Sequence, residues 1–345
     1  DLQRSGLFAP LKVSDMIAQP HDQTQVFYND WRLLGVDYLV VGSMARDAAG
    51  LYRVQFELYD VLRQSRLLQE TVNGSEAQLR DVAHYISDKV YEKLTGVRGA
   101  FSTKVAYVSA SQTAPNRQSF RLIKADADGE RAQTILESSE PILSPTWSPD
   151  GKQLAYVSFE DRRPGIYKQV IATGQREKLT SFPGLNSAPA WSPDGRRIAM
   201  VLSKDDNPEI YLLDLVTRQF TRLTQHFAID TEPSWMPDGR SLLFTSDRGG
   251  KPHIYQIDIA TRELKRLTFD GVYNARPRAM PDGSGIIYVH RSQPGGPVAG
   301  TRLRDPVTRP ASSRRARGRG LGEGLEVLLD LVVGGSRGVG PRLQV

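Results

Sequence analysis

"WSPDG", from Trp191 to Gly195, is the most informative stretch of this 345-residue chain because the chain repeats it at a constant interval. The same pentapeptide runs from Trp147 to Gly151, and the variants WMPDG and AMPDG run from Trp235 to Gly239 and from Ala279 to Gly283. The aspartates of these stretches lie 44 residues apart, at Asp150, Asp194, Asp238 and Asp282. A constant period of this size predicts a repeat architecture in which each unit packs against the next.

Three other sequence markers share the same interval, so a chance match is excluded. The dipeptide IY occurs at Ile166–Tyr167, Ile210–Tyr211 and Ile254–Tyr255. The dipeptide LT occurs at Leu179–Thr180, Leu223–Thr224 and Leu267–Thr268. A third, mostly apolar run reads LAYVS at 154–158, IAMVLS at 198–203 and LLFTSD at 242–247.

Each repeat divides into four short strands and shows no helical period. In the unit that starts near Ala188, APAW is the first strand, and RRIAMVLS, IYLLDL and FTRLT are the next three. The SPDG between the first two predicts a tight turn: proline presets φ, aspartate bonds the local backbone and glycine accepts a left-handed φ. Four strands in about 44 residues are typical of a β-propeller blade.

The repeated tryptophans are expected to be structural. Trp147, Trp191 and Trp235 occupy the same place in successive units, where a large flat side chain can fill the wedge between neighbouring sheets. We therefore interpret WSPDG as a packing and turn motif and its aspartate as a turn residue, and we predict no catalytic residue in it.

The repeat predicts about four complete blades. An earlier partial unit starts at KVAYVS (Lys104–Ser109), which parallels LAYVS, and a fifth opens at SGIIYVH (Ser284–His290) and is then lost. A ring cannot close at that point, so we expect a broken propeller over residues 100–291.

Residues 1–99 differ and predict a small α/β domain that is incomplete at its start. The stretches 36–45, 52–61 and 66–74 alternate in polarity as strands do. Ser75 and Gln78 fit a capping box, the following residues have helical apolar spacing, and Gly96 fits a helix end. Residues 96–103 then form the linker. The fold class is thus an α/β domain followed by an all-β propeller.

Residues 292–345 form a basic tail that lacks Lys, Asn, Ile, Phe, Tyr, Met, His and Trp. Several of these residues have codons rich in A and T, so their joint absence suggests a GC-rich gene read out of frame. The alternative is a natural disordered tail that contacts nucleic acid nonspecifically. Residues 291–345 hold 10 arginines, no lysine and 4 acidic residues. The resulting net charge of this tail, +6, equals the net charge of the whole chain. We therefore predict no nucleic-acid partner for the remainder.

Composition excludes several further classes. The chain has no cysteine, which excludes disulfides, cysteine-based zinc sites and thiol catalysis. No apolar run has the length of a membrane span, and the absence of an initial methionine suggests a processed or truncated chain.

On these residues the chain resembles the TolB family, periplasmic propeller proteins of the Tol–Pal envelope system. The resemblance covers residues 1 to about 291 and rests on DLQRSGLFAPL (1–11), EKLTGVRGAF (92–101), LSPTWSPDGKQLAYVSFE (143–160) and TEPSWMPDGRSLLFTSD (231–247). The family's first strand, its TolA-contacting segment, and the end of its six-bladed ring have no counterpart here.

The resemblance implies a non-enzymatic scaffold without cofactor or metal, located in the periplasm of a Gram-negative bacterium and peripheral to the outer membrane. It implies binding of the lipoprotein Pal, capture by colicins, TolA contact through the absent segment, and roles in outer-membrane integrity and in constriction during cell division. By position in the repeat, the loops of one propeller mouth would bind Pal: Leu143, Ser144, Leu185, Asn186, Ser187, Ala188, Asp230, Thr231, Glu232, Asn274, Ala275 and Arg276.

Two expectations accompany this site. Propeller geometry places Asp205, Asp206, Asp247 and Arg248 on the same side of the ring. Charge reversal at Glu232, or a bulky residue at Ala188, should weaken Pal binding without changing the melting temperature.

Two enzyme classes remain as alternatives. Similar propellers precede the catalytic domain of some serine peptidases, and GGSRG (334–338) matches G-x-S-x-G, but all five histidines precede Ser336. A propeller lyase or lactonase needs metal ligands, whereas His226 and His253 lack a matching cluster. A Ca²⁺ ion among loop carboxylates is not indicated by any spacing. We therefore predict that the chain is not an enzyme.

Overall fold

The computed structural model of the chain describes residues 1–115, 117–304 and 343–344. They fall into two compact units. The first comprises 1–105, 125–132 and 343–344, and the second comprises 106–115, 117–124 and 133–304. The domain limits 1–99, 100–291 and 292–345 stay predictions. Over the described part of the chain, every helix is too short or too polar to cross a bilayer.

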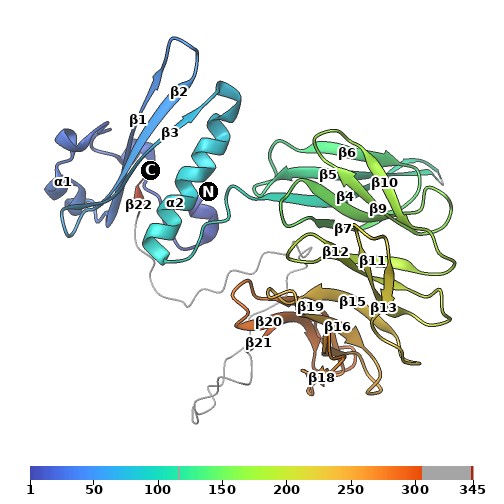
Figure 1. Cartoon of the computed structure of the whole chain (residues 1–345). Helices are drawn as coiled ribbons and strands as arrows, with labels where there is room; N and C mark the ends of the chain where they lie inside the picture. The colour runs from blue at the N-terminus through green and yellow to red at the C-terminus, as the bar shows by residue number, and fades with distance from the viewer. Residues whose placement is uncertain (116, 305–342, 345) are drawn as a thin grey trace. The chain divides into compact units, whose positions relative to one another are not determined.

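The first unit is a small sheet covered by one long helix (Figure 1). Strands β1 (Tyr38–Arg46), β2 (Tyr52–Asp60) and β3 (Ser65–Gly74) form an antiparallel meander. Strand β22 (Leu343–Gln344) pairs in parallel with β1. Helix α2 (Leu79–Thr95) buries Val90 and Tyr91 in one core with Leu58. The shorter helices are η1 (Leu2–Ser5), η2 (Val13–Asp15), η3 (Gln23–Gln25), α1 (Tyr28–Leu33) and η4 (Glu76–Gln78).

The continuous helical segment formed by η4 and α2 begins and ends at the predicted signals. Ser75 and Gln78 form the capping box, in which the Ser75 N–H donates to the Gln78 side-chain oxygen at 3.0 Å. Gly96 ends the helix with a φ of 73°, a left-handed conformation that glycine adopts without a Cβ clash. The predicted strands and helix of this unit are therefore confirmed.

The second unit consists of five sheets (Figure 1). The first contains β4 (Lys104–Ala114), β5 (Arg117–Asp126) and β6 (Gln133–Ser138). The second contains β7 (Ile142–Trp147), β8 (Gln153–Ser158), β9 (Gly165–Val170) and β10 (Arg176–Thr180). The third contains β11 (Asn186–Trp191), β12 (Arg197–Leu202), β13 (Glu209–Asp214) and β14 (Phe220–Arg222). The fourth contains β15 (Asp230–Trp235), β16 (Ser241–Ser246), β17 (His253–Asp258) and β18 (Leu264–Arg266). The fifth contains β19 (Tyr273–Ala279), β20 (Gly285–Arg291) and β21 (Ala299–Arg304).

Within the described residues, three sheets have four strands and two have three, where the repeat predicts about four complete blades. β4 holds the sequence that parallels the second strands, so no described strand takes the first position of that sheet. The last sheet continues past Arg291, where its loss was expected, because β21 pairs with β20 through backbone bonds that composition does not reveal. The remainder of the tail, 305–342 and 345, lies outside the described residues.

The repeated turn is built as the sequence predicts. The carboxylates of Asp150, Asp194, Asp238 and Asp282 each accept the backbone N–H two residues later, at 2.9 to 3.1 Å. The glycines that follow them, at 151, 195, 239 and 283, have φ between 67° and 70°.

The tryptophans pack between neighbouring sheets. Trp235, at 7% exposure, lies in one core with Val201 of the third sheet and Phe244 of the fourth. Trp191 lies likewise between Val157 of the second sheet and Met200 of the third. The predicted wedge role is thus confirmed.

The IY and LT markers acquire a joint explanation. The buried hydroxyls of Thr180, Thr224 and Thr268 accept the backbone N–H of the isoleucines at 166, 210 and 254, at 3.2, 2.9 and 2.9 Å. Each threonine ties the end of a fourth strand to the third strand, so both markers repeat together.

Candidate functional site

A strained bulge recurs near the start of each first strand of the second unit. The register between the first and second strands shifts there in β7, β11, β15 and β19. Ser144, Ala188, Glu232 and Arg276 have left-handed φ values of 50°, 48°, 56° and 54°. Such backbone costs a residue with a Cβ roughly 1 kcal/mol. We call the end of the four sheets that carries these bulges the mouth of the unit.

The twelve predicted Pal-binding residues all lie at the mouth, but eleven of them are strand residues and not loop residues. All except Leu185 belong to first strands, because each strand starts before its bulge. Exposed members are Leu143, Ser144, Leu185 and Arg276, and half-buried members are Ser187, Ala188, Thr231 and Glu232. Buried members are Asn186, Asp230, Asn274 and Ala275. The last group is out of reach of a partner and supports the surface from beneath.

Two of the buried residues fold the preceding loop onto the strand with their amide groups. The Nδ2 of Asn186 donates to the Phe182 carbonyl at 2.7 Å, and its Oδ1 accepts the Phe182 N–H at 3.1 Å. Asn274, 88 residues later, donates in the same way to the Asp270 carbonyl at 2.9 Å.

Asp230 occupies the same position in the intervening sheet, but its carboxylate cannot donate to carbonyls. The side-chain amide of Asn207, from the β12–β13 connection, takes over this role and donates to the carbonyls of His226 (2.8 Å) and Ala228. Asp230 pairs with the Arg248 guanidinium. Burial raises the pKa of the Asp230 carboxyl, and the ion pair with Arg248 opposes that shift.

The connections between second and third strands also reach the mouth. Leu185 donates its N–H to the Ser203 hydroxyl at 2.7 Å, and Ile229 donates its N–H to Asp247 at 2.8 Å. These contacts place the segments of Asp205, Asp206, Asp247 and Arg248 on this side, as propeller geometry predicts.

Apolar side chains are exposed around the mouth at the repeat interval. Leu185, Ile229 and Tyr273 occupy equivalent positions and are 46%, 50% and 38% exposed. Phe227 and Phe269, in the loops before β15 and β19, are 87% and 70% exposed. Apart from Leu185, the sequence reasoning missed them, although the 44-residue spacing of Leu185, Ile229 and Tyr273 was a usable signal.

The candidate enzyme residues have structural partners. His226 donates its N–H to Glu209 at 2.6 Å, and its Nδ1 accepts the Ala228 N–H at 3.0 Å. His253 is buried against Thr268 and Asn274. The GGSRG stretch lies outside the described residues.

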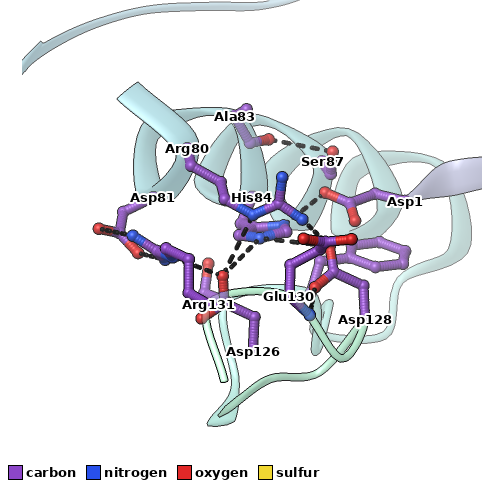
Figure 2. A network of polar contacts seen from close by, with 12 residues as sticks. Asp1, Arg80, Asp81, Ala83, His84, Ser87, Asp126, Asp128, Glu130 and Arg131 are labelled. Carbon is purple, nitrogen blue, oxygen red and sulfur yellow. Dashed lines mark hydrogen bonds and ion pairs between the residues drawn. The ribbon is translucent and has the colours of Figure 1, made fainter. Parts of the chain in front are cut away.

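A second polar cluster lies in the first unit, where α2 meets residues 125–132 (Figure 2). His84 is 3% exposed, and its Nδ1 lies 2.7 Å from the Asp1 carboxylate. Its Nε2 lies 3.5 Å from Asp126 and makes no hydrogen bond to the part of the chain that the structure describes. Ligand-type atoms of Asp1, His84 and Asp128 lie within 4.8 Å of one another.

Basic side chains already neutralise the carboxylates of this cluster. Arg80 pairs with Asp126 and Asp128, and Arg131 pairs with Asp126 at 2.7 Å. Burial alone would raise the pKa of Asp126, yet Arg131 and Lys104 hold that pKa well below its usual range. We therefore assign the cluster as an ion-pair network that fixes residues 125–132 on α2.

Two families match the chain. The family described as TolB beta propeller domain matches residues 91–313, and that described as TolB amino-terminal domain matches residues 1–67. The crystal structure of TolB from Acinetobacter baumannii superposes with a TM-score of 0.82 at 44% identity, over 88% of this chain and 75% of that one.

Curated relatives are similar over part of their length. The Tol-Pal system protein TolB of Alcanivorax borkumensis is 53% identical over 189 residues, which are 54% of this chain and 43% of the relative. That of Marinomonas sp. is 52% identical over 191 residues, 54% of this chain and 44% of the relative. The match thus spans less than half of these relatives.

Proposed function

Since this chain belongs to the TolB family of the Tol–Pal system, we propose that its second unit is a non-enzymatic scaffold that binds Pal at the mouth. The observation that carries the proposal is a row of exposed side chains at equivalent repeat positions, Leu185, Ile229 and Tyr273. Each is followed in the sequence by a buried polar residue that holds a neighbouring loop. Apolar anchors on a fixed backbone are typical of protein-binding surfaces.

The remaining expectations of the family belong to the same proposal. We assign the chain to the periplasm, with Pal as its partner at the outer membrane, and with roles in envelope integrity and constriction during division. Colicins would use the same mouth, and TolA would contact the amino-terminal segment of the family. An enzyme role has no support from the described residues, because the histidines once considered as ligands bond to neighbouring backbone and side chains.

Calorimetric titration of the full chain with the soluble domain of the cognate Pal tests the proposal. Leu185→Asp should weaken binding about tenfold or more, because a buried interface anchor typically contributes over 1 kcal/mol. Val216→Asp is the matched control: Val216 is 79% exposed and lies in the β13–β14 turn, at the other end of the third sheet. Equal affinities for both variants and the unaltered chain would contradict the proposed site.

A further inference from the structure

One buried histidine at the mouth is part of a hydrogen-bonded row of side chains that the proposed function does not use. His253 begins β17 and is 3% exposed. The equivalent positions in the two preceding sheets hold Gly165 and Glu209, so the imidazole is peculiar to this sheet among those three. Asn274, at the start of β19, lies between His253 and His290.

The direction of each hydrogen bond in this row of side chains follows from one fixed group, the Asp270 carbonyl. Asn274 donates its Nδ2 to the Asp270 carbonyl at 2.9 Å, and a carbonyl can only accept, so the amide orientation is set. The same Nδ2 lies 3.0 Å from Nδ1 of His253, which must therefore accept. The Oδ1 of Asn274 lies 2.7 Å from Nδ1 of His290, which must therefore donate.

A third contact agrees with an accepting Nδ1 on His253. The Thr268 hydroxyl accepts the Ile254 N–H at 2.9 Å, which leaves its proton free for His253 at 3.1 Å. The Asn274 amide needs the lone pair of an uncharged ring, because a protonated imidazole carries hydrogen on both nitrogens.

Protonation of His253 is incompatible with this arrangement. A proton on Nδ1 would face the amide hydrogens of Asn274. Turning the Asn274 amide would bring its oxygen to His253, but it would direct Nδ2 at the donating Nδ1 of His290 and leave the Asp270 carbonyl without its donor. Each alternative removes at least one bond that holds the loop before β19.

The surroundings of His253 also disfavour its charge. Burial lowers the pKa of its imidazole, and Arg266 of β18, Lys251 of the β16–β17 connection and His290 of β20 act in the same direction. Asp270, in the loop before β19, opposes them.

We propose that uncharged His253 is a positioning residue of the Pal-binding mouth. Its Nδ1 and the Asp270 carbonyl both accept from the Asn274 amide, and we call these two hydrogen bonds the clasp on Asn274. Protonation of His253 releases the clasp and weakens partner binding. The inference rests on the proposed function. The link to the surface is short: Asn274 follows the exposed Tyr273 and precedes the bulge residue Arg276 by two positions. Loss of the clasp therefore moves two exposed groups of the mouth.

The test compares Pal affinity of the full chain at about pH 7.5 and about pH 5, because the lowered pKa of His253 places its titration below the range of an ordinary histidine. The unaltered chain should bind about fivefold or more weakly at the lower pH, the size of a modest coupling between two sites. His253→Gln keeps an oxygen that accepts from Asn274 but does not titrate, so its affinity should stay constant. His290→Gln, which leaves His253 in place, should retain the loss. An affinity of the unaltered chain that stays constant at a pH where nitrogen NMR shows a protonated His253, or an equal loss in His253→Gln, would overturn the inference.

A second measurement separates this inference from the proposed function. Nitrogen NMR of the histidine rings reports the tautomer without any partner. Two results would support the clasp. Nδ1 of His253 carries no proton at neutral pH, and the amide signals of Tyr273 and Arg276 shift on acidification only when His253 is present. A protonated Nδ1 at neutral pH overturns it. Absence of Pal binding at both pH values would refute the proposed function, and the NMR result would still decide on the clasp.

Discussion

Arg276 donates its backbone N–H to the Glu232 carboxylate at 2.8 Å, although 44 residues separate them, because both occupy the bulge of a first strand in adjacent sheets. The Arg276 guanidinium adds a contact at 3.3 Å, and the Thr245 hydroxyl donates to the same carboxylate at 2.8 Å. The preceding bulges carry Ala188 and Ser144, whose side chains are too short for this link. Glu232 therefore joins β15, β16 and β19 at the mouth.

Glu232→Ala should lower the free energy of unfolding by about 1 to 3 kcal/mol. It leaves the Thr245 hydroxyl without its acceptor, and it leaves the Arg276 N–H with only the longer of its two bonds, to the Thr245 oxygen at 3.2 Å. Chemical denaturation measures the change. Arg276→Ala is the control and should cost less than about 1 kcal/mol, because its N–H still reaches Glu232 and its side chain is 73% exposed. These contacts also argue that charge reversal at Glu232 would not spare the melting temperature, unlike the expectation from sequence. Equal stability of Glu232→Ala and the unaltered chain would contradict the link.

The tryptophans at equivalent positions should respond differently to the same substitution. Trp235 donates its indole N–H to the Ala190 carbonyl at 3.0 Å, whereas the buried indole N–H of Trp191 has no partner among the described residues. Phenylalanine removes similar volume at both sites. It removes a hydrogen bond only at 235, and at 191 it removes an unsatisfied donor. Trp235→Phe should therefore be more destabilising than Trp191→Phe by about 1 to 3 kcal/mol in thermal or denaturant unfolding. The reverse order would show that packing, and not the indole bond, distinguishes the two sites.

The repeat made the sheets of the second unit predictable and left the mouth only partly so. Strand positions, turns and the wedge role of Trp191 follow from local pattern copied at a fixed period. The burial of Asn186, Asp230 and Asn274 does not, because their partners lie in loops whose path depends on the neighbouring sheet. Nor does sequence spacing reveal the contact of His84 with Asp126, which joins α2 to a segment 42 residues away.

Asn207 is expected to replace the amide that Asp230 lacks. Asn207→Ala leaves the carbonyls of His226 and Ala228 without a donor and should destabilise the second unit by about 1 to 3 kcal/mol. Adding Asp230→Asn restores an amide at the position where Asn186 bonds the equivalent carbonyls. The double variant should therefore be more stable than the sum of the two single changes predicts, by about 1 kcal/mol, in a double-mutant cycle. Strict additivity would mean that Asn207 does not substitute for the missing amide.

The ion-pair network of the first unit should make that unit depend on the Asp126 charge. Asp126 is 3% exposed and accepts from Arg80, Lys104 and Arg131. Asp126→Asn removes the one carboxylate that all three cations share, although Arg80 keeps Asp128, and Lys104 and Arg131 keep Asp81. Removing one member of a buried pair typically costs about 3 to 5 kcal/mol. Because the three cations are 34 to 40% exposed and each keeps a second carboxylate, we expect about 1 to 2 kcal/mol here.

The pH dependence of the same variant provides the second half of this prediction. The pKa of Asp126 is lowered in the folded chain, so the folded state binds fewer protons than the unfolded state as pH falls. The stabilisation by Asp126 is thus fully present above the ordinary carboxyl pKa of 3.8 and is lost as pH falls below it. The free energy of unfolding is measured with denaturant and followed at Trp31 in the first unit. The difference in this free energy between Asp126→Asn and the unaltered chain should be constant near neutrality and should narrow below about pH 4. Glu76→Gln, an exposed change in the same unit, should show no such difference at either pH. A difference for Asp126→Asn that persists unchanged into acid would show that the carboxylate charge does not stabilise the network.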